Sequence, residues 1–159
     1  ILEYTPAQIN RYTFFKLPSV WWCGIRVKEI NAQICRAAVQ LRWFNQNPFQ
    51  SIFWAVQGMA AELTTGMLLV REIEKSNKKV SFLVLNNKAG FSKKARGRIV
   101  FQCDQGKIAA EAIASLSPEN KTRTLWLSST GVDEQGDQVS HFEFEWTLLL
   151  KNTDSTALN

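Results

Sequence analysis

Residues 47–70 of the chain read NPFQSIFWAVQGMAAELTTGMLLV, and the remainder of the fold has to accommodate this apolar stretch. We expect residues 48–71 to form one helix, because Asn47 can act as its N-cap and Pro48 occupies a first-turn position that tolerates proline. A surface helix has one apolar and one polar face, but here apolar residues occur on nearly every side. The helix therefore has to be enclosed, either by lipid or by the rest of the protein.

Two polar residues argue against a membrane-spanning helix. Gln57 and Glu62 lie inside the stretch, and a carboxylate at the centre of a bilayer costs about 2.5 kcal/mol or more. The flanking segments alternate polar and apolar residues, as the strands of a water-soluble domain do. We therefore expect a helix packed against a sheet and no membrane span.

Composition sets broad limits on the class of protein. A length of 159 residues predicts a single domain over residues 1–159, and a net charge of +5 permits an anionic partner without specifying one. The three cysteines match no metal-binding spacing, so we expect reduced, mostly buried thiols in a cytoplasmic protein. No metal or other cofactor is expected, and the first residues do not have the pattern of a signal peptide.

The chain alternates between helical and strand patterns. We expect a short amphipathic helix over residues 6–16, with Ile9, Tyr12, Phe14 and Phe15 as its packing residues. A second small helix is expected over residues 107–116. Strands are expected over residues 25–30, 34–43, 80–89, 97–104, 122–130 and 139–150. In the second strand, alternation predicts inward-facing side chains at Cys35, Ala37, Val39, Leu41 and Trp43. This order predicts an α+β domain in which five to six antiparallel strands curl around the helix at 48–71.

The element order and the central helix resemble the hotdog fold. Acyl-CoA thioesterases of the family named for phenylacetate degradation often carry an Asn, then His-Gly-Gly, then an acidic residue about nine positions after the His. Here Asn47 precedes Phe53-Trp54-Ala55, and Glu62 follows Phe53 by nine residues. The chain is also similar to the DUF4442 group of thioesterase-like hotdog proteins, which share the N-terminal helix and the Pro and Gly before the first strand.

This resemblance implies hydrolysis of an acyl-CoA or acyl-carrier thioester in a tunnel at a dimer interface. Glu62 would be the catalytic residue, and Asn47, Phe53 and Trp54 would contact substrate. His-Gly-Gly is replaced by Phe53-Trp54-Ala55, which leaves backbone N–H groups at the helix start as the groups able to bind an oxyanion. A non-catalytic protein that binds an acyl group or another small ligand is the alternative function. The structural alternative for Glu62 is a hydrogen-bonded carboxylate buried across the dimer.

A basic loop and two isolated polar residues complete the candidates. Lys93, Lys94 and Arg96 form either a clamp for the phosphates of coenzyme A or a solvated loop. Gln57 lies five residues before Glu62, so we expect a core amide rather than a partner on the same helix face. His141 has no triad partners and is expected at the surface. Nucleic acid is disfavoured as a partner, because the aromatic residues follow core periodicity.

The amount of chain is small for so apolar a helix. We therefore expect a homodimer, or a tetramer built from it, whose interface includes the central helix and the strand at residues 80–89.

Overall fold

The computed structural model describes residues 4–151. Its helices are α1 (Pro6–Lys16), α2 (Pro18–Trp22), α3 (Trp54–Ser76) and α4 (Gly106–Ala114), with a short 3₁₀ helix, η1, at Trp43–Asn45. Its strands are β1 (Arg26–Ile30), β2 (Cys35–Gln40), β3 (Val80–Phe91), β4 (Arg98–Cys103), β5 (Thr122–Val132) and β6 (Gln138–Leu150).

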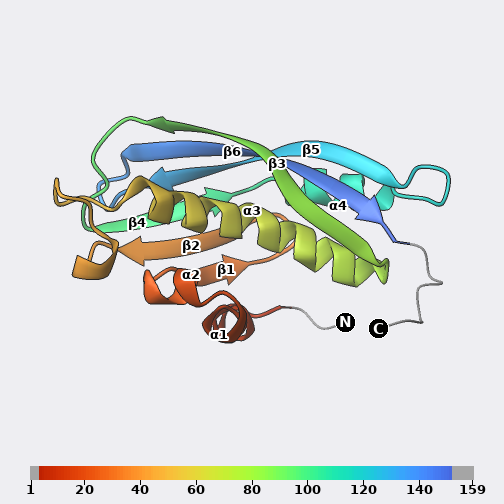
Figure 1. Ribbon diagram of the computed structural model, residues 1–159, viewed down its shortest axis with the longest axis horizontal. Helices are drawn as coiled ribbons and strands as arrows, with labels where there is room; N and C mark the ends of the chain where they lie inside the picture. Colours follow the sequence, from red (N-terminus) through yellow and green to blue (C-terminus); the bar gives the residue numbers. More distant parts are fainter. Residues whose placement is uncertain (1–3, 152–159) are drawn as a thin grey trace.

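The strands form one six-stranded antiparallel sheet in the order β1-β2-β4-β5-β6-β3. The long helix α3 lies across one face of this sheet, and α1 and α2 lie beyond β1 (Figure 1). Along β6, buried Phe142, Phe144, Trp146 and Leu148 alternate with half-buried residues, so one face of the strand packs on the core. The predicted α+β hotdog fold, a curled antiparallel sheet around one long helix, is confirmed.

The central helix begins six residues later than predicted, at Trp54 rather than Pro48. Asn47 does not cap a helix, because its side-chain oxygen accepts hydrogen bonds from the N–H groups of Phe49 and Ser51 at 2.9 and 3.3 Å. This local turn competes with helix formation. Ile52, which follows the turn, is buried and donates its N–H to the carbonyl of Ala95, so this segment is tied to the loop before β4.

The helix also ends later than predicted, at Ser76 rather than residue 71. The charged run after Val70 continues the helix, and Asn77 ends it in the left-handed conformation with a φ of 55°. Among residues 4–151, no helix is long and apolar enough to cross a bilayer.

The N-terminal third departs from the predicted burial. Of the four packing residues expected on α1, only Ile9 is buried; Tyr12, Phe14 and Phe15 are exposed. Strand β2 ends at Gln40, and the chain then turns into η1, which leaves Trp43 exposed instead of facing inward. Pro18 both ends α1 and starts α2, where it occupies a first-turn position.

The cysteines are free thiols, as expected. Cys35 and Cys103 are buried and face each other across β2 and β4. Burial raises the pKa of Cys35 to about 12 and that of Cys103 to about 11, so both thiols stay protonated at neutral pH.

The two edges of the sheet differ. At the β1 edge, the Asn10 side chain from α1 accepts the N–H of Val27 at 2.8 Å and donates to the Val27 carbonyl at 2.9 Å. It therefore satisfies backbone groups that another strand would otherwise pair with. At the other edge β3 pairs, among the strands that the structure describes, only with β6, and its residues from Leu85 to Phe91 are exposed.

Candidate functional site

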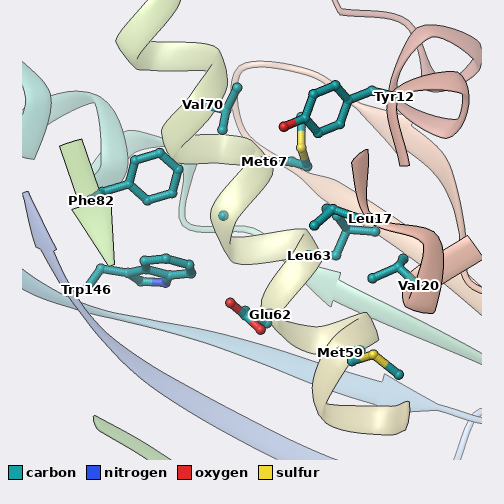
Figure 2. A pocket seen from close by; sticks show the side chains of 11 residues that line it. Tyr12, Leu17, Val20, Met59, Glu62, Leu63, Met67, Val70, Phe82 and Trp146 are labelled. Carbon is teal, nitrogen blue, oxygen red and sulfur yellow. The ribbon is translucent and has the colours of Figure 1, made fainter. Parts of the chain in front are cut away.

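Glu62 lies in a groove beside α3, between residues of β3 and β6 on one side and residues of the α1–α2 segment on the other. The cavity there measures about 220 Å³. Figure 2 shows Phe82 and Trp146 on one side of the helix and Tyr12, Leu17 and Val20 on the other. The helix supplies residues spaced three or four positions apart, which share one face. Its contributions are Met59, Glu62, Leu63, Gly66, Met67 and Val70.

The Glu62 side chain is exposed in the single chain, although we expected the helix that carries it to be enclosed. The difference arises because the groove is open on one side. The lining of the groove is otherwise almost entirely apolar, and burial raises the pKa of the Glu62 carboxyl above its ordinary value of 4.5. Within residues 4–151, the carboxylate has no hydrogen-bond or ion-pair partner. It is therefore solvent-accessible but poorly solvated, which is the condition that favours a general base.

Hydrogen bonds fix the wall beside Glu62. The indole Nε1 of Trp146 donates to Oγ1 of Thr65 at 3.2 Å, and Thr65 in turn donates to the backbone carbonyl of Glu62 at 2.9 Å. One residue earlier, Thr64 and Ser129 share a buried hydrogen bond of 2.8 Å. These contacts hold α3 against β5 and β6, so the position of Glu62 relative to Trp146 is set by the core.

The predicted substrate-binding residues gather at the N-terminal end of α3, away from the Glu62 cavity. One hollow is lined by several of them together with Phe49 and Phe91; the predicted members are Asn47, Phe53, Trp54, Lys93 and Lys94. Arg96 lines a neighbouring hollow with Asn47 and Pro48. The structure thus brings these six residues together and leaves Glu62 apart from them.

The polar groups of this hollow are partly engaged. The Asn47 amide nitrogen donates to Ser51 Oγ at 3.0 Å, in addition to the turn contacts made by its oxygen. Lys93 Nζ lies 2.5 Å from Asp133 and 2.7 Å from Asp137. These hydrogen bonds raise the pKa of Lys93, and the contact with Lys93 lowers the pKa of Asp133. Two carboxylates thus offset the positive charge of Lys93.

The other two basic residues of the loop are less engaged by acids. Lys94 Nζ lies 5.7 Å from the ring centroid of Phe49, and Arg96 is exposed. Among the three, Lys94 and Arg96 are better placed to meet an anionic ligand.

The first turn of α3 has no side-chain cap. Phe53 stands at the N-cap position with φ −58° and ψ 136°, and its side chain makes no capping hydrogen bond to the first N–H groups of the helix. The N–H groups of Trp54 and Ala55 precede the first intrahelical bonds and point out of the helix end. Glu62 is eight residues further along the helix than Trp54, which places it about 12 Å away. One chain therefore does not bring Glu62 and these donors to the same atom.

Of two other polar residues, Gln57 behaves as predicted and His141 is more buried than predicted. Gln57 is a buried core amide that donates to the Ile52 carbonyl at 3.0 Å and accepts from Ser140 Oγ at 2.8 Å. His141 is half-buried on β6, where Nδ1 lies 2.8 Å from Oγ1 of Thr130. No three His, Cys, Asp or Glu side chains within residues 4–151 lie together in a way that could hold a metal ion.

The sequence prediction omitted most of the walls of the Glu62 groove. Tyr12 was expected to be a packing residue of its helix, but nothing in the sequence connected Tyr12 or Trp146 with Glu62. Leu17 caps the start of the short helix α2 and Val20 lies within it, and this helix was not predicted at all.

Solved structures of other proteins share this fold. A protein of unknown function from Pseudomonas aeruginosa, described as a probable thioesterase, superposes with a TM-score of 0.79 at 18% identity, over 92% of this chain and 97% of that one. A protein of unknown function from Chlorobaculum tepidum gives 0.77 at 15% identity, over 93% and 98%. A thioesterase from Haemophilus influenzae gives 0.74 at 11% identity, over 97% and 96%.

At these identities the likeness is one of fold. No curated protein matches this chain in sequence. A family model does match, over residues 5–148, and its description is "Domain of unknown function (DUF4442)". Since the match spans most of the chain, the protein belongs to the DUF4442 family.

Proposed function

We propose that the protein is a thioester hydrolase in which Glu62 is the general base. The observation that carries the proposal is the Glu62 carboxylate itself: its pKa is raised by burial and it borders an apolar cavity. Glu62 takes a proton from water, the resulting hydroxide adds to the thioester carbonyl carbon, and the thiol leaves with that proton. Two of the proteins of the same fold are described as thioesterases or probable thioesterases, which agrees with this chemistry.

The cavity dimensions suit an acyl group rather than a whole coenzyme. At about 220 Å³, the cavity is smaller than the roughly 300–1,000 Å³ typical of sites that enclose a complete small molecule. Apolar side chains surround it on both sides of α3 (Figure 2). The acyl chain would occupy this cavity, while the coenzyme A or carrier part would remain outside.

A second copy of the chain would complete the site. In a two-fold dimer that pairs the β3 edges, the α3 helices run antiparallel along their open sides. If they cross near Gly58, midway between Trp54 and Glu62, then Glu62 of one copy lies beside the free N–H groups of the other. Those N–H groups would stabilise the oxyanion. Lys94 and Arg96 lie at the same end of α3 and would contact the phosphates of coenzyme A.

A non-catalytic acyl-binding protein is the second candidate. One observation favours it: of the residues that line the Glu62 cavity, only Glu62 and Tyr12 end in an oxygen-bearing polar group. A groove so poor in hydrogen-bond donors can hold an acyl chain whether or not the thioester is cleaved.

Hydrolysis of a series of acyl-CoAs of increasing chain length, by wild type and by Glu62→Gln, separates the two candidates. We expect kcat to fall by about 100-fold or more in Glu62→Gln, because the amide cannot accept the proton. Binding of a non-hydrolysable thioether analogue and the melting temperature should stay unchanged. Glu111→Gln, at an exposed position on α4, is the matched control and should retain wild-type turnover.

Two results would count against hydrolysis by Glu62. If the wild type binds the thioether analogue but cleaves no acyl-CoA, the protein is a non-catalytic acyl-binding protein. A Glu62→Gln variant whose activity falls only in proportion to the loss of folded protein has lost a structural residue, a change that costs about 1–3 kcal/mol for a polar group left unsatisfied.

A further inference from the structure

Six aromatic residues gather where α1, α2 and η1 meet. They are Phe14, Phe15, Trp21, Trp22, Trp43 and Phe44, here called the aromatic face. Four of them are largely exposed: Trp43 by 78%, Phe15 by 69%, and Trp22 and Phe44 by 66% each. Large exposed apolar side chains that cluster in this way mark an interaction surface.

The aromatic face is continuous. Phe14 packs edge-on against Phe15 and Trp21, with ring centroids 4.8 and 5.2 Å apart. Phe44 contacts Trp22 and Trp43, at 6.2 and 5.2 Å. A groove lined by Phe14, Trp21, Trp22 and Phe44 joins the two groups and also contains Arg26 and Arg42. The Arg26 guanidinium carbon lies 3.4 Å from the ring centroid of Trp21.

The part of the sequence that contains the aromatic face is also strongly basic. Residues 4–61 contain six basic residues and one acid, Glu29, so this segment carries a net +5, equal to that of the whole protein. Glu29 is already paired with Arg36 at 2.7 Å. Arg11, Lys16 and Arg42 are exposed on or beside α1 and η1, and no acid within residues 4–61 is left to neutralise them.

We propose that the aromatic face docks onto the surface of a bilayer that contains anionic lipid. Trp and Phe rings enter the interfacial region of a bilayer, and the surrounding Lys and Arg side chains bind the negative headgroups. The aromatic face combines exposed rings with uncompensated positive charge. The surface of an anionic bilayer can bind both. The inference is independent of the reaction that the Glu62 groove performs.

Two other possible partners fit the aromatic face less well than a bilayer does. A second copy of the chain would bring Arg42 and its basic neighbours against their own counterparts, and like charges at an interface are unfavourable. Single-stranded nucleic acid binds through ring faces that are free to stack, whereas Phe14, Phe15, Trp43 and Phe44 pack edge to face on one another. The aromatic face also lies on the β1 side of the sheet, opposite the open β3 edge.

The proposal makes the α1–α2 segment serve two surfaces. Tyr12, Leu17 and Val20 from this segment line the Glu62 groove, while Phe14, Phe15 and Trp22 belong to the aromatic face. Docking would therefore hold the groove close to the bilayer surface.

Co-sedimentation with vesicles tests the proposal, using phosphatidylcholine alone and phosphatidylcholine mixed with phosphatidylserine. We expect the wild type to bind the mixed vesicles and not the pure ones. Trp22→Ser/Trp43→Ser/Phe44→Ser should lower the affinity by more than about tenfold. Its matched control, Leu83→Ser/Leu85→Ser/Ile108→Ser, changes three exposed apolar residues elsewhere and should bind as the wild type does.

The charges need their own pair of variants. Arg11→Gln/Lys16→Gln/Arg42→Gln should lower the affinity for mixed vesicles on the order of 100-fold, since each basic residue near a charged bilayer contributes separately. Lys75→Gln/Lys107→Gln/Arg123→Gln removes the same charge from other surfaces and should change the affinity by less than about threefold. Circular dichroism and melting temperatures verify that all four variants are folded.

Three results would overturn the proposal. One is unchanged vesicle binding by the Trp22/Trp43/Phe44 variant, and another is equal loss in both charge variants. The third is a wild type that does not bind vesicles. This result would overturn the proposal whether the protein instead binds single-stranded RNA through the aromatic face or self-associates through it in sedimentation equilibrium.

Discussion

At the scale of the residue, Glu62 combines access to solvent with poor solvation. The sequence pointed to it because a carboxylate within an apolar stretch is costly to place there. The structure adds the cause of the raised pKa. Beside α3 lies an apolar groove in which, among residues 4–151, Tyr12 is the only other side chain that ends in oxygen, and the resulting burial raises the pKa of Glu62.

The raised pKa makes a prediction about the pH dependence of hydrolysis. A general base acts when ionised, so kcat/KM should fall as the pH drops through the raised pKa of Glu62. The acid limb should therefore lie above pH 4.5, the ordinary value for a glutamate. A pH–rate profile of the wild type measures it, and Glu111→Gln should leave the limb in place. An acid limb at or below pH 4.5 would be inconsistent with Glu62 as the base.

The contribution of Glu62 to the stability of the fold should depend on pH in the opposite direction from kcat/KM. Because folding raises the pKa of Glu62, the folded protein favours the protonated carboxyl, and this group stabilises the fold below its ordinary pKa rather than at neutral pH. Replacing the carboxylate with the neutral amide in Glu62→Gln is therefore not expected to lower the melting temperature at pH 7.

At the scale of the element, the sequence predicted the order of helices and strands better than it predicted their ends. The apolar stretch is real, but Asn47 forms a turn of its own, and only the residues from Trp54 onward are helical. Asn47 and Pro48 suit a turn as well as a helix start, so local chemistry alone cannot choose between them. The contact between Ile52 and Ala95 decides the outcome, and it joins segments far apart in the sequence.

Contacts between distant segments also explain why the predicted burial of the N-terminal segment was wrong. Tyr12, Phe14, Phe15 and Trp43 were expected to pack on the core because apolar residues usually do. Their exposure depends on where β2 ends and on how α2 turns the chain, and both are tertiary features.

The basic loop between β3 and β4 carries a prediction about ligand binding. Lys94→Ala/Arg96→Ala should raise the KM for an acyl-CoA by about fivefold or more at low salt, and the penalty should shrink as the salt concentration rises. Steady-state kinetics at two ionic strengths measure it. An acyl thioester of N-acetylcysteamine, which has no phosphates, is the control substrate and should show no change in KM.

Lys93→Ala is the comparison variant within the same loop. Its ammonium group is already paired with Asp133 and Asp137, so its removal should affect KM less than the double change does. If the double variant leaves the KM for acyl-CoA unchanged, the loop is only solvated surface.

At the scale of the whole molecule, the sheet has one blocked edge and one open edge. Asn10 occupies the β1 edge, whereas β3 presents unpaired backbone along its outer side. Ala89 and Phe91 are exposed, although their partners in β6, Phe142 and Ser140, are buried on the face that packs on the core. A second copy joined at β3 would cover these side chains.

Ala89→Arg should therefore weaken the dimer, by about 100-fold or more, because it places two like charges at the two-fold interface. Ile108→Arg introduces the same side chain at an exposed position on α4, outside β3, and is the matched control. Sedimentation equilibrium of wild type and both variants measures the dissociation constants. A wild type that stays monomeric at micromolar concentration would refute the dimer.

The central claim is that each active site combines Glu62 of one copy with the first N–H of α3 from the other. Trp54→Pro removes that N–H while keeping the helix start, because Phe53 already has a conformation that suits a following proline. Trp54→Ala is its control, since it removes the ring but keeps the N–H. Alone, Trp54→Pro and Glu62→Gln should each be nearly inactive, and Trp54→Ala should be markedly more active than Trp54→Pro.

Mixing equal amounts of Trp54→Pro and Glu62→Gln and allowing subunits to exchange tests the claim most directly. Half of the dimers are then mixed, and each mixed dimer has one intact site and one doubly altered site. The account predicts recovery of about a quarter of wild-type acyl-CoA hydrolysis. A mixture that remains as inactive as its components, with mixed dimers present, would contradict it.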